Sequence, residues 1–95
     1  MDGDETLAAW PPGETEMAAR IRVFDWARTP LGPINRWPVS LKVAVQLVLA
    51  QDNPTNLVVG PASTMIYNDR CAAMIGSKHP RGLGRNAHET FPEVE

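Results

Sequence analysis

The stretch LVVGPASTMIYNDRCAAMIG, residues 57–76, decides the fold of this chain. It predicts a strand, a tight turn, a second strand and a short helix, in that order. Leu57 to Val59 and Thr64 to Tyr67 are rich in residues that favour strands, and the Gly-Pro-Ala-Ser sequence between them has the composition of a turn. Two such runs separated by a few residues that include glycine are typical of a β-hairpin.

A short helix is expected directly after the hairpin. Asp69 is placed to cap it, because its carboxylate can accept the free backbone N–H groups of the first helical turn. Cys71 to Ile75 would form this helix, and Gly76 can adopt the left-handed conformation that ends one. Further along the chain, Leu83 to Glu89 predicts a short helical turn.

Residues 14–26 have the spacing of an amphipathic helix. Met17, Ile21 and Phe24 recur at intervals of four and three residues, which places them on one face. An apolar stripe of this width either packs against the chain's own sheet or forms a dimer contact, and the sequence leaves both readings open.

A second helix is predicted from Pro38 to Ala50. Proline fits the first helical position because its missing N–H has no intrahelical partner there. The helix is apolar over most of its surface, so we expect this chain or another copy of it to cover the helix on most sides. The preceding TPLGPINRWP sequence excludes a regular helix, and we expect Leu31 and Trp37 to pin this connector to the core.

The whole-chain composition excludes several classes of function. The chain has 95 residues, enough for one domain, and a net charge of −2, which makes nucleic acid an unsuitable partner. One cysteine fits a reducing compartment, and no apolar stretch approaches the ~20 residues that span a bilayer, so we expect a cytoplasmic location without a membrane span. Residues 1–13, which hold Pro-Pro-Gly, are expected to form a disordered leader.

Several short motifs occur in a characteristic order. They are G-P-x-x-T-x-I-Y-N-D at 60–69, I-G-x-K-H-P at 75–80 and L-G-R at 83–85, preceded by F-D-W at 24–26, T-P-L-G-P at 29–33, W-P at 37–38 and S-L at 40–41. From about Met17 to Glu95 the chain resembles the first half of a PAS domain, and more narrowly the PAS modules near the N-termini of many bacterial sensor histidine kinases.

This resemblance implies an α+β fold. Residues 14–50 would form an N-terminal helical segment with a Pro-rich connector, and residues 51–95 the first half of a PAS-like domain. That half contains the hairpin and short helices and lacks the last three strands, which would need about 50 to 60 further residues. A sensory pocket would lie between sheet and helices. By pattern, the candidates to face it, with plain core as the alternative for each, are Val58, Ile66, Tyr67, Met74 and Ile75.

No catalytic or metal site is expected. Cys71, His79, His88 and Glu89 are the titratable candidates, but their spacing is not that of familiar metal ligands, and Cys71 lies in a helix that looks like core. In flavin-binding PAS domains a G-R-N-C motif supplies the reactive cysteine, and here Ala87 follows the Gly-Arg-Asn sequence. The resemblance therefore implies no flavin adduct, and haem is also unsupported.

Three functions remain after this reading. The favoured one is a non-catalytic sensory or interaction module in bacterial two-component signal transduction. It would belong to a histidine kinase and couple a change in its own packing to a partner or output domain, while the ATP chemistry would lie in another part of that kinase. The second is an autonomous truncated PAS paralogue that forms a homodimer or binds an intact PAS or kinase partner. The third is a small enzyme that uses Cys71 with a histidine.

Overall fold

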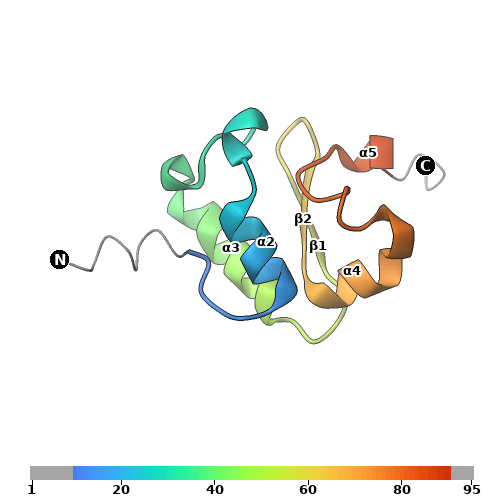
Figure 1. Ribbon diagram of the computed structural model, residues 1–95. Helices are drawn as coiled ribbons and strands as arrows, with labels where there is room; N and C mark the ends of the chain where they lie inside the picture. The colour runs from blue at the N-terminus through green and yellow to red at the C-terminus, as the bar shows by residue number, and fades with distance from the viewer. Residues whose placement is uncertain (1–9, 91–95) are drawn as a thin grey trace.

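The structure, a computed structural model, describes residues 10–90 (Figure 1). It is α+β, as expected. Three single 3-10 turns lie between the principal elements, at Trp26–Arg28, Ile34–Arg36 and Gly76–Lys78. The principal elements are α2 (Glu16–Val23), α3 (Val39–Ala50), β1 (Asn56–Val59), β2 (Thr64–Tyr67), α4 (Asp69–Ile75) and α5 (Ala87–Thr90).

The predicted hairpin is confirmed. Strands β1 and β2 pair antiparallel, with Leu57 opposite Ile66 and Val58 opposite Met65. The turn closes where the Ser63 N–H donates to the Gly60 carbonyl at 3.0 Å. In Figure 1 the long helices α2 and α3 lie on one side of the hairpin, and α4 and α5 lie on the other.

A third segment follows the second edge of β2. The Met65 N–H donates to the Arg85 carbonyl and the Met65 carbonyl accepts from the Gly84 N–H, both at 2.9 Å. An isolated bridge joins Thr64 to Asn86. The short helical turn predicted within residues 83–89 is present only at the end of that range, as α5, and residues 83–86 are not helical because this segment pairs with β2. Strand β2 is central, and β1 keeps an outer edge.

The two long helices lie within their predicted ranges, but α2 ends at Val23, three residues before the predicted end. Phe24, predicted on its apolar face, is instead the extended C-cap, with ψ of 144°. The Thr15 hydroxyl caps α2 by accepting the Ala18 N–H at 3.2 Å, and Met17 and Ile21 are fully buried, as the stripe predicts. Helix α3 packs on both strands. Pro38 is its N-cap, with an extended ψ of 155°, and not its first helical residue.

An aromatic cluster anchors the irregular connector. The rings of Trp26 and Trp37 meet edge to face with centroids 5.2 Å apart, and both side chains are buried. Their indole N–H groups donate to the carbonyls of Ile21 and Gly32, each at 2.8 Å. Buried indole nitrogens need such partners, so these bonds fix the connector where no regular element can form. The pinning role predicted for Trp37 is confirmed.

The last residues of the predicted leader belong to the packed domain. Trp10 contacts Trp37 edge to face at 6.0 Å, and Pro11 is buried. The Arg22 guanidinium donates to the carbonyls of Pro11 and Gly13, at 2.8 Å to each. The disorder predicted for residues 1–13 is therefore wrong for residues 10–13, because tertiary contacts that composition does not reveal hold this segment. Residues 1–9 of the predicted leader lie outside the described residues.

Candidate functional site

The five residues proposed to face a pocket do not gather in one place. Ile66 and Tyr67 are fully buried and Ile75 is partly buried, whereas Val58 is 48% and Met74 is 67% exposed. Val58 pairs with Met65, the neighbour of Ile66, so Val58 and Ile66 lie on opposite faces of the hairpin. No single cavity can therefore be lined by all five.

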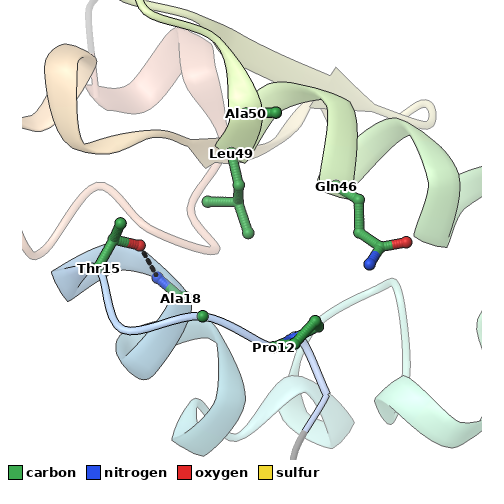
Figure 2. Close-up of a pocket in the computed structure, with 7 residues that line it drawn as sticks. Pro12, Thr15, Ala18, Gln46, Leu49 and Ala50 are labelled. Atoms are coloured by element: carbon green, nitrogen blue, oxygen red, sulfur yellow. Dashed lines mark hydrogen bonds between the residues drawn. The ribbon is translucent and has the colours of Figure 1, made fainter.

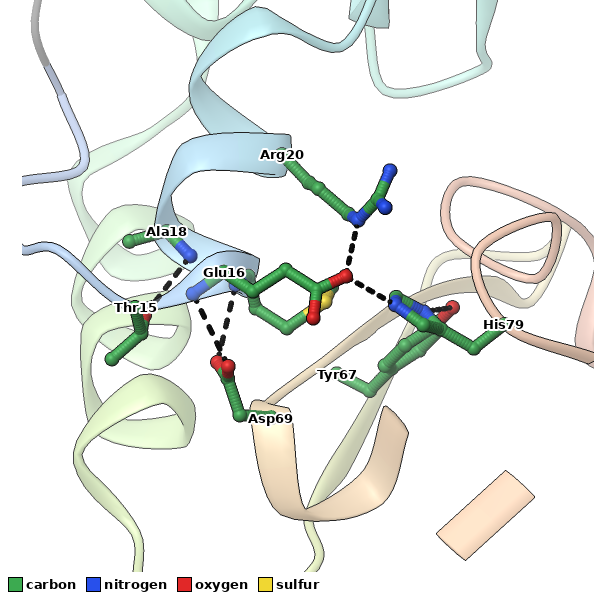
Figure 3. A network of polar contacts seen from close by, with 8 residues as sticks. Thr15, Glu16, Ala18, Arg20, Tyr67, Asp69 and His79 are labelled. Carbon is green, nitrogen blue, oxygen red and sulfur yellow. Dashed lines mark hydrogen bonds and ion pairs between the residues drawn. The ribbon is translucent and has the colours of Figure 1, made fainter. Parts of the chain in front are cut away.

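One of the five, Tyr67, does take part in a polar network. Its hydroxyl lies 2.9 Å from His79 Nδ1, and His79 Nε2 lies 2.8 Å from Glu16 Oε2 (Figure 3). The same Glu16 oxygen accepts from Arg20 Nε at 2.6 Å. The network thus joins α2, β2 and the loop after α4, which are far apart in the sequence.

The Glu16 carboxylate can only accept, so His79 Nε2 donates to it, and Nδ1 shares a hydrogen bond with the Tyr67 hydroxyl. Burial raises the pKa of Tyr67 to about 12, so this hydroxyl stays protonated and able to donate. Hydrogen bonds from His79 and then Arg20 lower the pKa of Glu16. Every group is satisfied, which describes a structural clamp better than a reactive triad.

Asp69 caps a different helix from the one predicted. Its carboxylate oxygens accept the N–H groups of Glu16 at 3.2 Å and Met17 at 3.1 Å, so it caps α2 across space (Figure 3). Helix α4 is instead capped by Asn68, whose side chain accepts the Cys71 N–H at 2.9 Å. The prediction of an Asp69 cap on α4 is wrong, because the residue before it already occupies the cap position.

Asn68 is the most connected polar side chain that sequence reasoning missed. It is buried, and its Oδ1 accepts from the Thr55 N–H at 3.1 Å in addition to the cap bond. Its Nδ2 donates to three carbonyls at and beyond the end of α3, those of Val48 at 3.1 Å, Gln51 at 3.4 Å and Asn53 at 2.9 Å. One amide therefore joins α3, the entry to β1 and the start of α4. A polar residue between a strand and a helix is the available signal for such a role.

Cys71 is not arranged as a nucleophile. It is 4% exposed, and burial raises the pKa of its thiol, which disfavours the reactive thiolate. His79 already uses both ring nitrogens, on Tyr67 and Glu16. Within residues 10–90, no group of three His, Cys, Asp or Glu side chains could hold a metal ion.

The Gly-Arg-Asn sequence at 84–86 has a structural role in this chain. The φ of Gly84 is +78°, and a Cβ added there would lie 2.6 Å from the Phe24 ring, so only glycine fits. The Asn86 amide donates to the Ala62 carbonyl at 2.7 Å, and its oxygen accepts the His88 N–H at 2.7 Å to begin α5. Ala87 follows, partly buried, and its N–H completes the pairing with the hairpin turn.

A shallow hollow of about 240 Å³ separates the N-terminal segment from α3. Figure 2 shows Leu49 and Gln46 extending toward Pro12 and Ala18 across it. Its lining is mostly apolar, and it contains none of the five predicted pocket residues. The hollow marks incomplete packing between α2 and α3, and no charged side chain lines it.

Across residues 10–90, no helix has the length and apolarity that crossing a bilayer requires. Comparison of the chain with known proteins finds no matching family model, no matching curated protein and no matching solved structure.

Proposed function

We propose that the chain is a non-catalytic sensory or interaction module, the first half of a PAS-like domain from a cytoplasmic two-component sensor histidine kinase of bacteria. The order of its short sequence motifs supports this proposal, as does a hairpin followed directly by a capped helix. The observation that carries it is the outer edge of β1, where the sheet can accept another strand.

The open edge follows from the hydrogen-bond pattern. Met65 directs both its N–H and its carbonyl toward the 84–86 segment. Because paired residues in antiparallel strands alternate, Leu57 exchanges bonds with Ile66, and Val58 points its N–H and carbonyl away from β2. Within residues 10–90 no backbone group bonds to Val58 from that side. Its side chain is half exposed beside the same edge.

An added strand would change both the backbone and the apolar surface at this edge. It would pair with the free groups of Val58 and cover its side chain, which is the general mode of strand addition. The polar network and the Asp69 cap tie β2 and the loop after α4 to α2. A change in the packing of the sheet would therefore reach α2, which is the coupling that a sensory module needs.

The test of this proposal uses the native protein from its host. An antibody against residues 14–90 would precipitate it, and the precipitate would be measured for mass and for histidine phosphorylation from labelled ATP. We expect a polypeptide several times larger than the 10.4 kDa of this chain, with acid-labile phosphate. A native polypeptide of the mass of this chain, without phosphate, would refute the proposal.

A second candidate is an autonomous truncated paralogue that self-associates. Its support is an uncovered stripe on α3, where Val39, Val43 and Leu47 recur every fourth residue and are 77%, 48% and 58% exposed. Helices with such a stripe are usually covered by a partner. Concentration-dependent melting that is lost in Leu47→Glu and kept in Gln46→Glu would support it. Melting independent of concentration would exclude it.

The small-enzyme alternative has a direct test. Cys71 should react with a thiol reagent only after denaturation, because it is buried and its thiol pKa is raised. Rapid stoichiometric labelling of the native chain would reopen this alternative.

A further inference from the structure

A second hollow lies between the end of α2 and the loop that follows α4. Its volume is about 410 Å³, and it is open to the surface. Two arginines and four apolar residues line it, and it includes none of the residues proposed above for pairing or association. The lining residues are Arg20, Val23, Phe24, Pro80, Arg81 and Leu83.

The apolar floor of this hollow is unusually accessible. Val23, at the end of α2, is 80% exposed. Phe24 is partly buried and packs on Trp26 with ring centroids 4.4 Å apart, while Leu83 is buried beneath. An exposed valine beside an aromatic face offers a surface that a bound apolar chain would shield from water.

Two arginines place guanidinium groups at the rim of the hollow. Arg20 forms an ion pair with Glu16 through its Nε, and its terminal nitrogens point away from that carboxylate (Figure 3). The Arg81 side chain has no hydrogen bond or ion pair to any part of residues 10–90. Arg81 also borders a neighbouring hollow of about 310 Å³, which Arg85 and Glu89 help to line. Cationic groups therefore outnumber anionic ones on this surface.

The loop that forms one wall is held in place before any ligand arrives. His79, which precedes Pro80 and Arg81, is fixed by Tyr67 and Glu16. The Gly82 N–H donates to the Lys78 carbonyl at 2.8 Å, and the Gly84 N–H is bonded to Met65. A preformed wall lowers the ordering cost of binding.

We propose that this hollow binds a small amphiphilic carboxylate, with its anionic group between Arg20 and Arg81 and its apolar chain over Val23 and Phe24. Guanidinium groups bind carboxylates through paired, charge-assisted hydrogen bonds, which specify the head group. The exposed apolar floor specifies a chain of a few carbons. The proposal does not depend on the kinase assignment, since every contact belongs to residues 20–83 of this chain.

The first test compares three probes on the full chain. Octanoate has both features, octanol lacks the charge, and acetate lacks the chain. Tryptophan fluorescence reports on the hollow because Phe24 packs against Trp26. We expect a saturable change in fluorescence with octanoate. Octanol and acetate should bind with an affinity lower by about tenfold or more. Equal binding of octanol and octanoate would overturn the proposal.

Matched variants locate the site. Arg81→Gln should weaken octanoate binding about tenfold, whereas Arg28→Gln, an exposed arginine outside the hollow, should not change it. Val23→Asp should also abolish binding. Arg81 and Val23 are both exposed, so neither substitution should disturb the fold, and near-ultraviolet circular dichroism would verify this. Identical affinities of Arg81→Gln and Arg28→Gln would overturn the proposal. So would binding to phosphatidylglycerol vesicles without binding to free octanoate, because the surface would then serve a membrane.

Discussion

Replacement of Asn68 by alanine is the most informative single change in the fold. The substitution removes the α4 cap, which is typically worth about 1 kcal/mol. It also removes the amide oxygen that accepts the Thr55 N–H in a partly buried setting, and an unsatisfied buried group costs about 1–3 kcal/mol. The Val48 carbonyl keeps the Gln51 N–H as a donor at 3.2 Å. The carbonyls of Gln51 and Asn53 are on exposed residues, so water can replace the amide there. We expect a total loss of about 3 kcal/mol, which is roughly a 150-fold change in the ratio of folded to unfolded chain.

Urea unfolding followed by tryptophan fluorescence would measure this loss. Asn35→Ala is the matched control, because Asn35 is exposed in the 3-10 turn before α3 and should change the free energy of unfolding by less than about 0.5 kcal/mol. If Asn68→Ala is unfolded without urea, an osmolyte titration would recover the transition and give the same difference. A loss no larger than that of Asn35→Ala would refute the assignment of Asn68 as the junction between α3, β1 and α4.

Three further predictions follow from single sites. Gly84→Ala should lower the free energy of unfolding by at least about 1 kcal/mol more than Gly32→Ala does, as measured in urea. Both glycines have positive φ, but only at Gly84 would an added Cβ lie 2.6 Å from the Phe24 ring. Equal losses in the two variants would contradict this close approach. Because the pKa of Glu16 is lowered in the fold, its carboxylate stabilises the fold at pH values above the ordinary 4.5, and this contribution is lost as the pH falls through the lowered pKa. Glu16→Gln should therefore melt below wild type at about pH 7, and the difference should shrink as the pH falls below 4.5. A difference that persists in acid would contradict this. The raised pKa of Tyr67 means that the neutral hydroxyl stabilises the fold below pH 10.0, and this stabilisation is lost as the pH approaches 12. The absorbance of tyrosinate should therefore titrate near pH 12 in the folded chain and near pH 10 in urea. A native midpoint near 10 would contradict it.

Local sequence patterns predicted the elements well. Strand-forming residues around a Gly-Pro turn produce the β1–β2 hairpin, and the Met17–Ile21 stripe marks the buried face of α2. These signals depend on neighbouring residues only, so they can be read without knowing the fold. The end of α4 is also predictable from local sequence, because Gly76, its C-cap, has a φ of +60°, which glycine adopts readily.

Contacts between distant segments were not predictable from such patterns. Asp69 caps α2, which lies more than fifty residues earlier in the chain, and residues 84–86 pair with β2 in place of forming a helix. Both outcomes depend on where the elements meet in space. The proposed pocket residues fail as a group for a similar reason, because apolar pattern cannot distinguish a core side chain such as Ile66 from an exposed one such as Val58.

The most direct test of the open edge on β1 is amide hydrogen exchange at Val58, measured with Leu57 as the internal reference. In the dilute isolated chain we predict protection of the Leu57 amide, which is bonded to β2, and exchange of the Val58 amide near its intrinsic rate. In the native protein from the host, an added strand should protect Val58 as well. A Val58 amide that exchanges freely in the native protein, or that is already protected in the dilute isolated chain, would contradict the account.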